Sequence, residues 1–273
     1  MLNDAEFALV AREVKARSGA MLTREMSPAA AMRLQPLARR EGFASISELV
    51  AAARIRPDGA LWNSVADHLA QSETRFFRDR ALFQLLRADI LPNALARRGH
   101  ERVRIWSAGC ATGQEAYSIA MMIEEMRDEG LNPATEIIAT DLSERLIDKA
   151  RAGLYTQFEV QRGLPIRKLI AYFEKAGDLW RISDRLRASV RFDTFNLMKH
   201  PGQLGQFDII LLCHVLGAFD AETRTAIVGR IAETLHPEGA IVLGHGETLP
   251  EGCESLSINN GIVTRNNAPR RAA

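Results

Sequence analysis

From Val103 onward, short apolar segments alternate with amphipathic ones. The segments VRIWSA (103–108), EIIATD (136–141), FDIILLCHVL (207–216) and GAIVLGHGE (239–247) have the composition of strands, and the stretches between them have helical lengths. Strands that are separated by helices of this length pair in parallel. The unbroken apolar run at 207–216 is typical of a strand that is buried on both faces. The sequence therefore predicts an α/β fold with a parallel sheet.

The chain before this alternation reads as helices, with no segment that resembles a strand. Phe7, Val10 and Val14 recur at spacings of three and four, which is the period of an amphipathic helix. A further helix is expected to begin with Ser27 as its N-cap, and Pro36 should kink or divide it. The pattern predicts a small all-helical domain at the N-terminus.

Two later segments interrupt the α/β pattern. Residues 181–196 (RISDRLRASVRFDTFN) read as short strands with polar turns, and they follow a helical segment at 164–177. We expect a small antiparallel β subdomain, inserted with its helix at about 156–195. The segment GIVTRN (261–266) is expected to add an edge strand to the main sheet. Residues 268–273 are predicted to be disordered.

Charge and cysteine content exclude several classes of protein. The 35 Lys and Arg residues nearly balance the 34 Asp and Glu residues, which leaves a formal net charge of +1 and no global attraction to nucleic acid. The three cysteines are widely spaced, which argues against a disulfide framework or a zinc site and suits a reducing compartment. No apolar run is long enough to span a bilayer, and the N-terminus lacks a signal-peptide core. We expect a cytoplasmic monomer without metal, nucleic acid or membrane insertion.

The loop after the first strand has small residues that let a ligand approach the backbone. Its glycines, Gly109 and Gly113, do not follow the dinucleotide spacing G-x-G-x-x-G, which disfavours a nicotinamide cofactor. Glu115 stands where a pyrophosphate would bind, and a carboxylate suits an ammonium group better. Asp141 ends the next strand, where an acid can bind ribose hydroxyls, and the amide of Asn196 can read an adenine edge. These residues favour S-adenosylmethionine over the alternative of a tight turn with a helix-capping glutamate.

Four stretches in order carry a family resemblance. They are SETRFFRD (72–79), RIWSAGCATGQEAYSIAM (104–121), ATDLSERLIDKARAGLY (139–155) and FDIILLCHVLGAFD (207–220), and LGHGETL (243–249) supports them. The chain resembles the CheR family of chemotaxis receptor methyltransferases over nearly its whole length. The resemblance implies S-adenosylmethionine-dependent methylation of glutamates on chemoreceptor cytoplasmic helices, with S-adenosylhomocysteine as the second product.

The resemblance also implies a domain layout and a set of site residues. The domains would be a helical part at 1–70, a linker and connecting helix at 71–100, and a methyltransferase domain with a doubly wound sheet at 101–267. Arg78 would bind the methionine carboxylate and position the cofactor, which is the catalytic role that the resemblance implies for it. The implied cofactor-binding residues are Ser72, Thr74, Arg78, Ala108, Gly109, Glu115, Asp141, Asn196, Leu197, Leu212 and Cys213.

The chain departs from the family pattern most clearly after the long apolar strand. The family usually reads C-R-N-V-x-x-Y-F-D, whereas residues 212–220 read LCHVLGAFD, without the arginine, the asparagine or the tyrosine. Ser72 replaces the asparagine that usually opens the linker motif, and Ala116 stands where proline is common. A second hypothesis follows: a member that binds S-adenosylmethionine but serves as a regulatory or interaction module.

The reaction that the resemblance implies needs no strong general base, because a glutamate side chain is ionised at neutral pH. We therefore interpret His214 as a histidine that hydrogen bonds hold in place, with a catalytic role as the alternative, and Cys213 as a buried thiol. Arginines of the helical part are candidates for receptor docking. They are Arg24, Arg33, Arg39 and Arg40. The segment EKAGDLWRI (174–182) is short, so we expect no dependence on a tether to a receptor's C-terminal pentapeptide.

Overall fold

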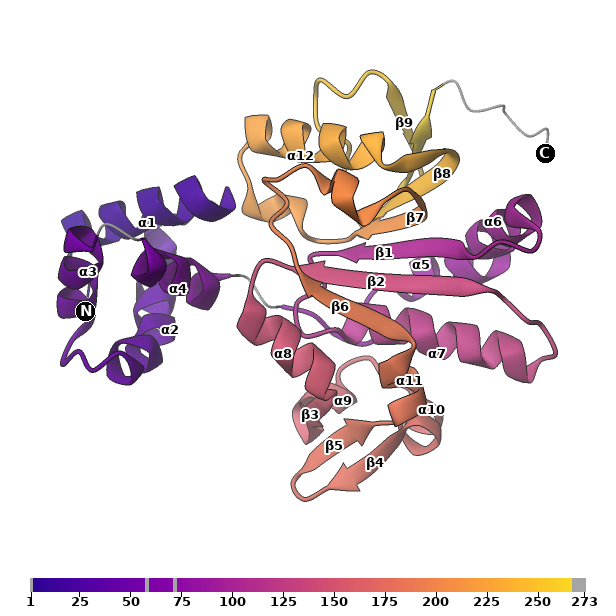
Figure 1. The fold of residues 1–273 in the computed structure, drawn as a ribbon, viewed down its shortest axis with the longest axis horizontal. Coiled ribbons are helices and arrows are strands. Elements are labelled where there is room, and N and C mark those ends of the chain that lie inside the picture. Colours follow the sequence, from indigo (N-terminus) through magenta and orange to yellow (C-terminus); the bar gives the residue numbers. More distant parts are fainter. Residues whose placement is uncertain (1, 57–58, 71–72, 267–273) are drawn as a thin grey trace. The chain divides into compact units, whose positions relative to one another are not determined.

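The computed structural model describes residues 2–56, 59–70 and 73–266 (Figure 1). The chain divides into two compact units. The smaller unit comprises Met1–Gln71 together with Gly217–Thr223, and the larger comprises Ser72–Leu216 and Arg224–Ala273. The predicted domain boundary near residue 70 did not anticipate that a segment so far along the chain belongs to the smaller unit.

The smaller unit is helical, as the apolar spacing predicted, and its described residues contain four α-helices. They are α1 (Asp4–Ser18), α2 (Ser27–Arg40), α3 (Ile46–Ile55) and α4 (Ala60–Leu69). Val10, Leu34, Leu49 and Val65 are completely buried and make its core. Pro36 lies inside α2 without dividing it, because the helix is continuous from Ser27 to Arg40. Ser27 is the first residue of α2 and Met26 is its N-cap, so the prediction that Ser27 caps this helix was wrong.

The larger unit contains the predicted doubly wound sheet, with strand order β6-β2-β1-β7-β8-β10-β9. Its parallel strands are β1 (Val103–Ala108), β2 (Thr135–Asp141), β6 (Val190–Thr194), β7 (Phe207–Leu212) and β8 (Leu235–Leu243). The order runs outward in both directions from the β1–β7 pair, so the topological switch lies there. In such sheets ligands bind beyond the carboxyl ends of the strands at the switch.

The far side of the sheet is antiparallel. Strand β10 (Ile262–Arg265) pairs with β8 and with β9 (Leu256–Asn259). The segment predicted to be the edge strand is therefore one position in from the edge, which β9 occupies.

Helices cover both faces of the sheet (Figure 1). Helices α7 and α8 pack on β2 and β6, whereas α6 packs on β1 and β7. The helices around the large sheet are α5 (Arg80–Leu85), a π-helical turn (Leu86–Ile90), α6 (Leu91–Arg98), α7 (Gln114–Asp128), α8 (Glu144–Ala152) and α12 (Ala221–Glu233). Among the residues that the structure describes, no helix combines the length and apolar character needed to cross a bilayer.

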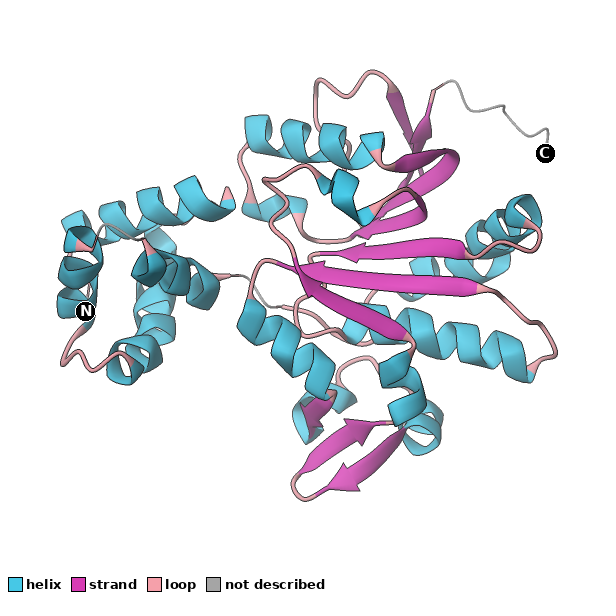
Figure 2. Cartoon of the chain, viewed as in Figure 1, coloured by secondary structure: helices cyan, strands magenta, loops and turns pink. Residues whose placement is uncertain are grey.

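A separate small sheet, with strand order β3-β5-β4, lies beside the large one (Figure 2). Its strands are β3 (Leu154–Thr156), β4 (Phe173–Ala176) and β5 (Leu179–Ile182), and the helices around it are α9 (Gln157–Gln161), α10 (Ile166–Tyr172) and α11 (Asp184–Ala188). The interpretation of residues 181–196 as strands and turns of this insertion was wrong in two respects. Residues 184–188 form a helix, and β6 pairs in parallel with β2 in the main sheet. Alternating apolar residues at Val190 and Phe192 signal a strand, but they do not say which sheet it joins.

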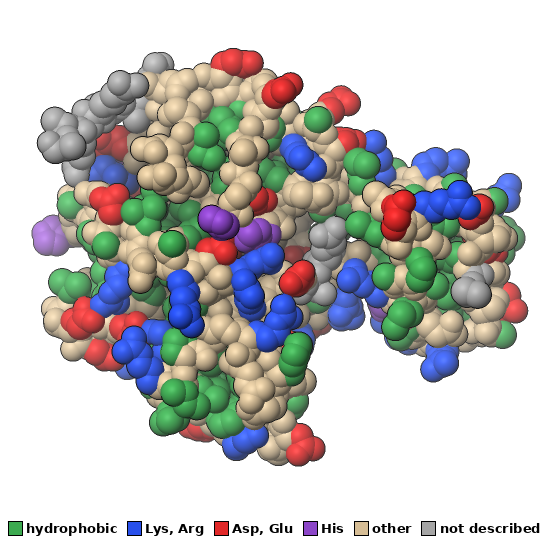
Figure 3. Space-filling model, turned by 180° about the vertical axis from the view of Figure 1, so that it is seen from behind, with side chains coloured by type: hydrophobic (Ala, Val, Ile, Leu, Met, Phe, Trp, Pro, Cys, Tyr) green, Lys and Arg blue, Asp and Glu red, His purple; other side chains and the backbone are tan. Residues whose placement is uncertain are grey.

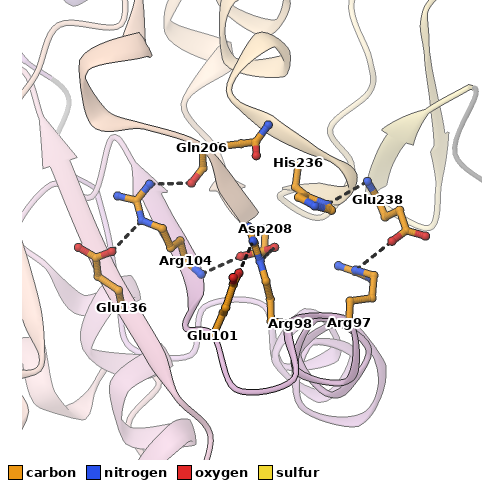
Figure 4. A network of polar contacts seen from close by, with 9 residues as sticks. All are labelled: Arg97, Arg98, Glu101, Arg104, Glu136, Gln206, Asp208, His236 and Glu238. Carbon is orange, nitrogen blue, oxygen red and sulfur yellow. Dashed lines mark hydrogen bonds and ion pairs between the residues drawn. The ribbon is translucent and has the colours of Figure 1, made fainter.

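A polar network fastens the amino ends of the parallel strands (Figure 4). Asp208, at the second position of β7, is almost fully buried. Its Oδ1 accepts a bond from Arg98 Nε at 2.8 Å, and its Oδ2 accepts one from the Arg104 N–H at 2.9 Å. Arg104 in turn reaches Glu136 Oε2 at 2.7 Å. The network ties α6, β1, β2 and β7 together at the edge opposite to the strands' carboxyl ends.

Candidate cofactor site

The loop between β1 and α7 requires both of its glycines. Gly109 and Gly113 have φ values of +74° and +89°, a region that L side chains rarely adopt. A Cβ on Gly109 would lie 2.7 Å from Val215 Cγ2, and a Cβ on Gly113 would lie 2.9 Å from Ala150 Cβ. The loop therefore sits tightly between the turn that follows β7 and helix α8, at the topological switch.

Asp141 holds this loop from the end of β2. Its Oδ2 accepts the Ala111 N–H at 2.9 Å, and its Oδ1 accepts the Ser143 N–H at 3.0 Å. Ala111 has a φ of +48°, so the carboxylate stabilises a left-handed residue at the centre of the loop. Ala108, which ends β1, is buried beneath the loop. The acid that the sequence predicted for the ribose thus lies against the predicted cofactor loop.

Glu115 lies in the first turn of α7, on the other side of the loop. Its Oε1 accepts a bond from Ser107 Oγ at 2.7 Å. Desolvation raises the pKa of the Glu115 carboxyl, and nearby Asp79 raises it further, while Ser107, Cys213 and His214 oppose the rise. A carboxylate in such surroundings is stabilised by an added cation. The donor and acceptor chemistry of this site therefore fits the ammonium group and the ribose of S-adenosylmethionine.

The linker is fixed to the larger unit by its two phenylalanines. Phe76 is completely buried, with its ring edge-on to Tyr155 at 5.2 Å between centroids. The Phe77 N–H donates to Ser118 Oγ of α7 at 3.0 Å. Tyr155 also donates its hydroxyl to Thr112 O of the glycine loop at 2.8 Å. One aromatic residue of β3 thus contacts both the linker and the loop.

The predicted linker contacts lie near this anchor. Arg78 is half-buried and donates from Nη1 to Glu73 O at 3.2 Å, and Thr74 is also half-buried. Ser72 lies outside the described residues. The assignment of these three residues to the cofactor stays a prediction.

The remaining predicted residues end the neighbouring strands. Asn196 and Leu197 follow β6, where Asn196 Oδ1 accepts the Met198 N–H at 2.9 Å. Leu212 ends β7 and has no accessible surface. Cys213 follows it, and its thiol contacts Val242 O at 3.5 Å. The fold brings all of these residues to the carboxyl edge of the sheet, and their contacts with a cofactor stay predictions.

Sequence reasoning missed two acids at this edge, Asp79 and Glu247. Asp79 Oδ2 accepts bonds from His214 Nε2 at 2.9 Å and from the His245 N–H at 3.0 Å. Glu247 Oε2 accepts the N–H groups of His214 at 2.6 Å and Gly244 at 2.8 Å. The stretches RFFRD and GHGE contain both acids, but nothing local shows that they converge on one histidine.

The backbone accounts for one departure from the family pattern. His214 stands where the family has asparagine, and its φ is +58°. Among residues other than glycine, Asn, Asp and His are the most enriched in this left-handed region. The substitution therefore keeps a residue suited to the turn while it changes the side chain.

Comparisons with known proteins agree with this geometry. A family model described as "CheR methyltransferase, SAM binding domain" matches residues 72–261. The chain is 34% identical over 270 residues to Chemotaxis protein methyltransferase 1 of Pseudomonas aeruginosa, which covers 96% of this chain and 98% of that protein. It is 34% identical over 238 residues to Chemotaxis protein methyltransferase Cher2 of Pseudomonas putida, covering 85% and 86%.

The chain belongs to the CheR methyltransferase family. It is therefore a methyltransferase that uses S-adenosylmethionine, and the family, fold class and cofactor predicted from the sequence are confirmed. The segment that the family model matches also contains the residues at the carboxyl edge of the sheet. The glycine loop, Glu115 and Asp141 lie inside the segment that the SAM-binding model matches.

Proposed function

We propose that the chain transfers methyl groups from S-adenosylmethionine to glutamate side chains on the cytoplasmic helices of chemoreceptors, for sensory adaptation. The observation that carries this proposal is the convergence of Glu115 and Asp141 on the glycine loop of a CheR-family fold. The names of the relatives, chemotaxis protein methyltransferases, support the assignment to receptors.

The proposed site needs few catalytic groups. When bound, S-adenosylmethionine supplies an electrophilic methyl group on a positively charged sulfur. Glu115 would bind the ammonium group, Asp141 the ribose, and Arg78 the methionine carboxylate. The acceptor glutamate is already ionised, so the protein's task is to align it and to exclude water.

The helical unit is the proposed receptor-docking part. Arg24 pairs with Asp4 at 2.6 Å, Arg40 pairs with Glu41 at 3.1 Å, and Arg33 donates to backbone carbonyls. Arg39 is exposed near the end of α2, and among the described residues no hydrogen bond or ion pair engages its side chain. We therefore expect Arg39 to be the strongest of the four docking candidates.

A tether to the receptor's C-terminus is not part of the proposal. Strands β4 and β5 of the small sheet join through a tight turn at Gly177 and Asp178, which leaves no long loop to hold a peptide. A cytoplasmic monomer that acts directly on receptor helices remains our proposal. Tight capture of this protein by a receptor's C-terminal pentapeptide would contradict it.

The deciding experiment transfers a labelled methyl group to membranes that contain receptors. We expect base-labile methyl esters on the receptors, and we expect none when the receptor glutamates are replaced by alanine. Calorimetry with S-adenosylhomocysteine runs in parallel, with NAD as the ligand that should not bind. Normal cofactor binding without any ester would refute the transferase proposal.

That outcome would favour the second hypothesis, a cofactor-binding regulatory module. Ala218 is the observation behind it, because an alanine cannot supply the hydroxyl of the family's tyrosine. Ala218 belongs to the smaller unit, where its carbonyl accepts the Met21 N–H at 2.8 Å.

A further inference from the structure

Three segments of the larger unit meet around His214. They are the end of the linker, which contributes Asp79; the turn after β7, which contributes His214; and the turn after β8. One oxygen of Asp79 accepts from both His214 Nε2 and the His245 N–H, at 2.9 and 3.0 Å. Glu247 binds the backbone of the same histidine at 2.6 Å. His214 is thus the common partner of two acids from distant parts of the chain.

The backbone around His214 is arranged for this contact. A Cβ on Gly244 would lie 2.6 Å from His214 Nε2, so only glycine leaves room for the ring. His214 itself is left-handed, and so are Phe77 of the linker and Ala111 of the loop. Strained backbone of this kind persists where the surrounding contacts hold it, and it gathers at functional sites.

The Asp79 side chain contacts His214 and does not cap helix α5. It is the N-cap of α5, where an aspartate normally accepts a backbone N–H of the first turn. Here its side chain makes no capping bond. Burial tends to raise the pKa of Asp79, but the bonds from His245 and His214 outweigh it and lower that pKa. The carboxylate is therefore ionised, and His214 Nε2 is the donor.

The contact between Asp79 and His214 bears on Arg78, because Arg78 directly precedes Asp79 in the chain. Phe76 and Phe77 anchor the upstream part of the linker independently. Arg78 Nη1 donates to the Glu73 carbonyl, which lies within the linker, at 3.2 Å. The bonds that Asp79 accepts from the His214 side chain and from the His245 N–H thus tie the arginine's end of the linker to the sheet edge, and His214 supplies the one that comes from a side chain.

We propose that His214 is a positioning residue that, through Asp79, holds Arg78 against the amino-acid end of S-adenosylmethionine. This inference rests on the proposed cofactor site. On the face of the larger unit in Figure 3, histidine side chains lie beside acidic ones, and Lys and Arg side chains gather between them and the end that carries the small sheet. His214 contacts both Asp79 and Glu247 at the place where the linker reaches the sheet edge.

The test compares two ligands that differ only at the end in question. S-adenosylhomocysteine carries the amino acid, and 5′-methylthioadenosine lacks it. We expect His214→Ala to raise the Kd of S-adenosylhomocysteine about tenfold, which corresponds to about 1.4 kcal/mol, and to leave that of methylthioadenosine unchanged, since that ligand has no group for Arg78 to bind. In transfer assays the KM for S-adenosylmethionine should rise while kcat stays nearly constant.

Two further variants sharpen the reading. His214→Gln keeps a donor near the Nε2 position and should restore most of the affinity. Asp79→Ala removes the acceptor and should reproduce the loss if His214→Ala does not fold. His200→Ala is the matched control, because His200 also pairs with an acid, Glu233, at 2.8 Å but on the exposed surface. It should change neither Kd.

The results separate this proposal from the site assignment. If Arg78→Ala leaves the affinity for S-adenosylhomocysteine unchanged, both fail. If Arg78→Ala weakens binding while a folded His214→Ala does not, this inference alone fails. Equal weakening of both ligands by His214→Ala would show a general collapse of the pocket and would also overturn it.

Discussion

The substitution Glu115→Gln tests the cofactor site most directly, because it removes a charge and almost nothing else. In the structure Glu115 Oε1 accepts the Ser107 hydroxyl at 2.7 Å, and the glutamine carbonyl can accept the same bond. Desolvation raises the pKa of Glu115, so its ionised form is disfavoured in the folded protein. The neutral variant should therefore be at least as stable as the parent chain.

Binding of the cofactor should respond in the opposite direction. A hydrogen bond to a charged group contributes about 1.5–3 kcal/mol, and each 1.4 kcal/mol is a factor of ten in Kd. Loss of the Glu115 charge should therefore weaken S-adenosylhomocysteine by about 10- to 150-fold. The upper half of that range is expected, because the amide N–H₂ of glutamine would then face the ligand's ammonium group.

Calorimetry over a pH series measures both the magnitude and its cause. The raised pKa of Glu115 means that the parent chain loses its carboxylate as pH falls through a value above the ordinary 4.5. Affinity for S-adenosylhomocysteine should decline through that acidic window in the parent chain, and the variant should lack this step. Glu129→Gln, at the exposed far end of α7, is the control. An unchanged Kd, or equal weakening of 5′-methylthioadenosine, would refute the assignment of Glu115 to the ammonium group.

Three further substitutions test other parts of the molecule. Asp208→Ala leaves Arg98 and the Arg104 N–H without their buried acceptor and should destabilise the larger unit by about 3 kcal/mol in urea unfolding, near the lower end for a broken buried pair because Arg98 keeps Glu101. Gly109→Ala forces a side chain into a left-handed position and against a neighbouring valine, so thermal unfolding should shift down and cofactor affinity should fall. Ala218→Tyr should raise methyl transfer if the missing hydroxyl limits the rate; an unchanged rate would mean that the acceptor side works differently.

The local parts of the fold follow from the sequence, and the pairing of distant parts does not. Apolar periodicity locates β1, α7, β2 and β7 because each pattern is complete within a few residues. Strand β6 shows the same periodicity, yet its partner is β2, far earlier in the chain. Strand β6 joins the main sheet because helix α11, which precedes it, brings the chain back beside β2. The residues of β6 alone do not indicate this pairing.

The candidate site divides in the same way. Gly109, Glu115 and Asp141 could be predicted because a strand, a turn and a helix N-terminus place them by local geometry. Asp79 and Glu247 could not, since their common partner is a histidine contributed by a third segment. Their contacts with His214 form only in the folded protein, where the turns after β7 and β8 lie side by side.

The departures from the family pattern after β7 fall into two groups, which should affect cofactor binding and methyl transfer differently. At positions 213 and 214 the missing arginine and asparagine are replaced by side chains that the larger unit engages, Cys213 against Val242 and His214 with Asp79. At position 218 the missing tyrosine is replaced by an alanine of the smaller unit, whose carbonyl accepts the Met21 N–H. The first two changes leave a connected cofactor edge, so cofactor affinity should be retained. Any loss of transferase activity should therefore trace to Ala218 and to the acceptor, rather than to the binding of S-adenosylmethionine.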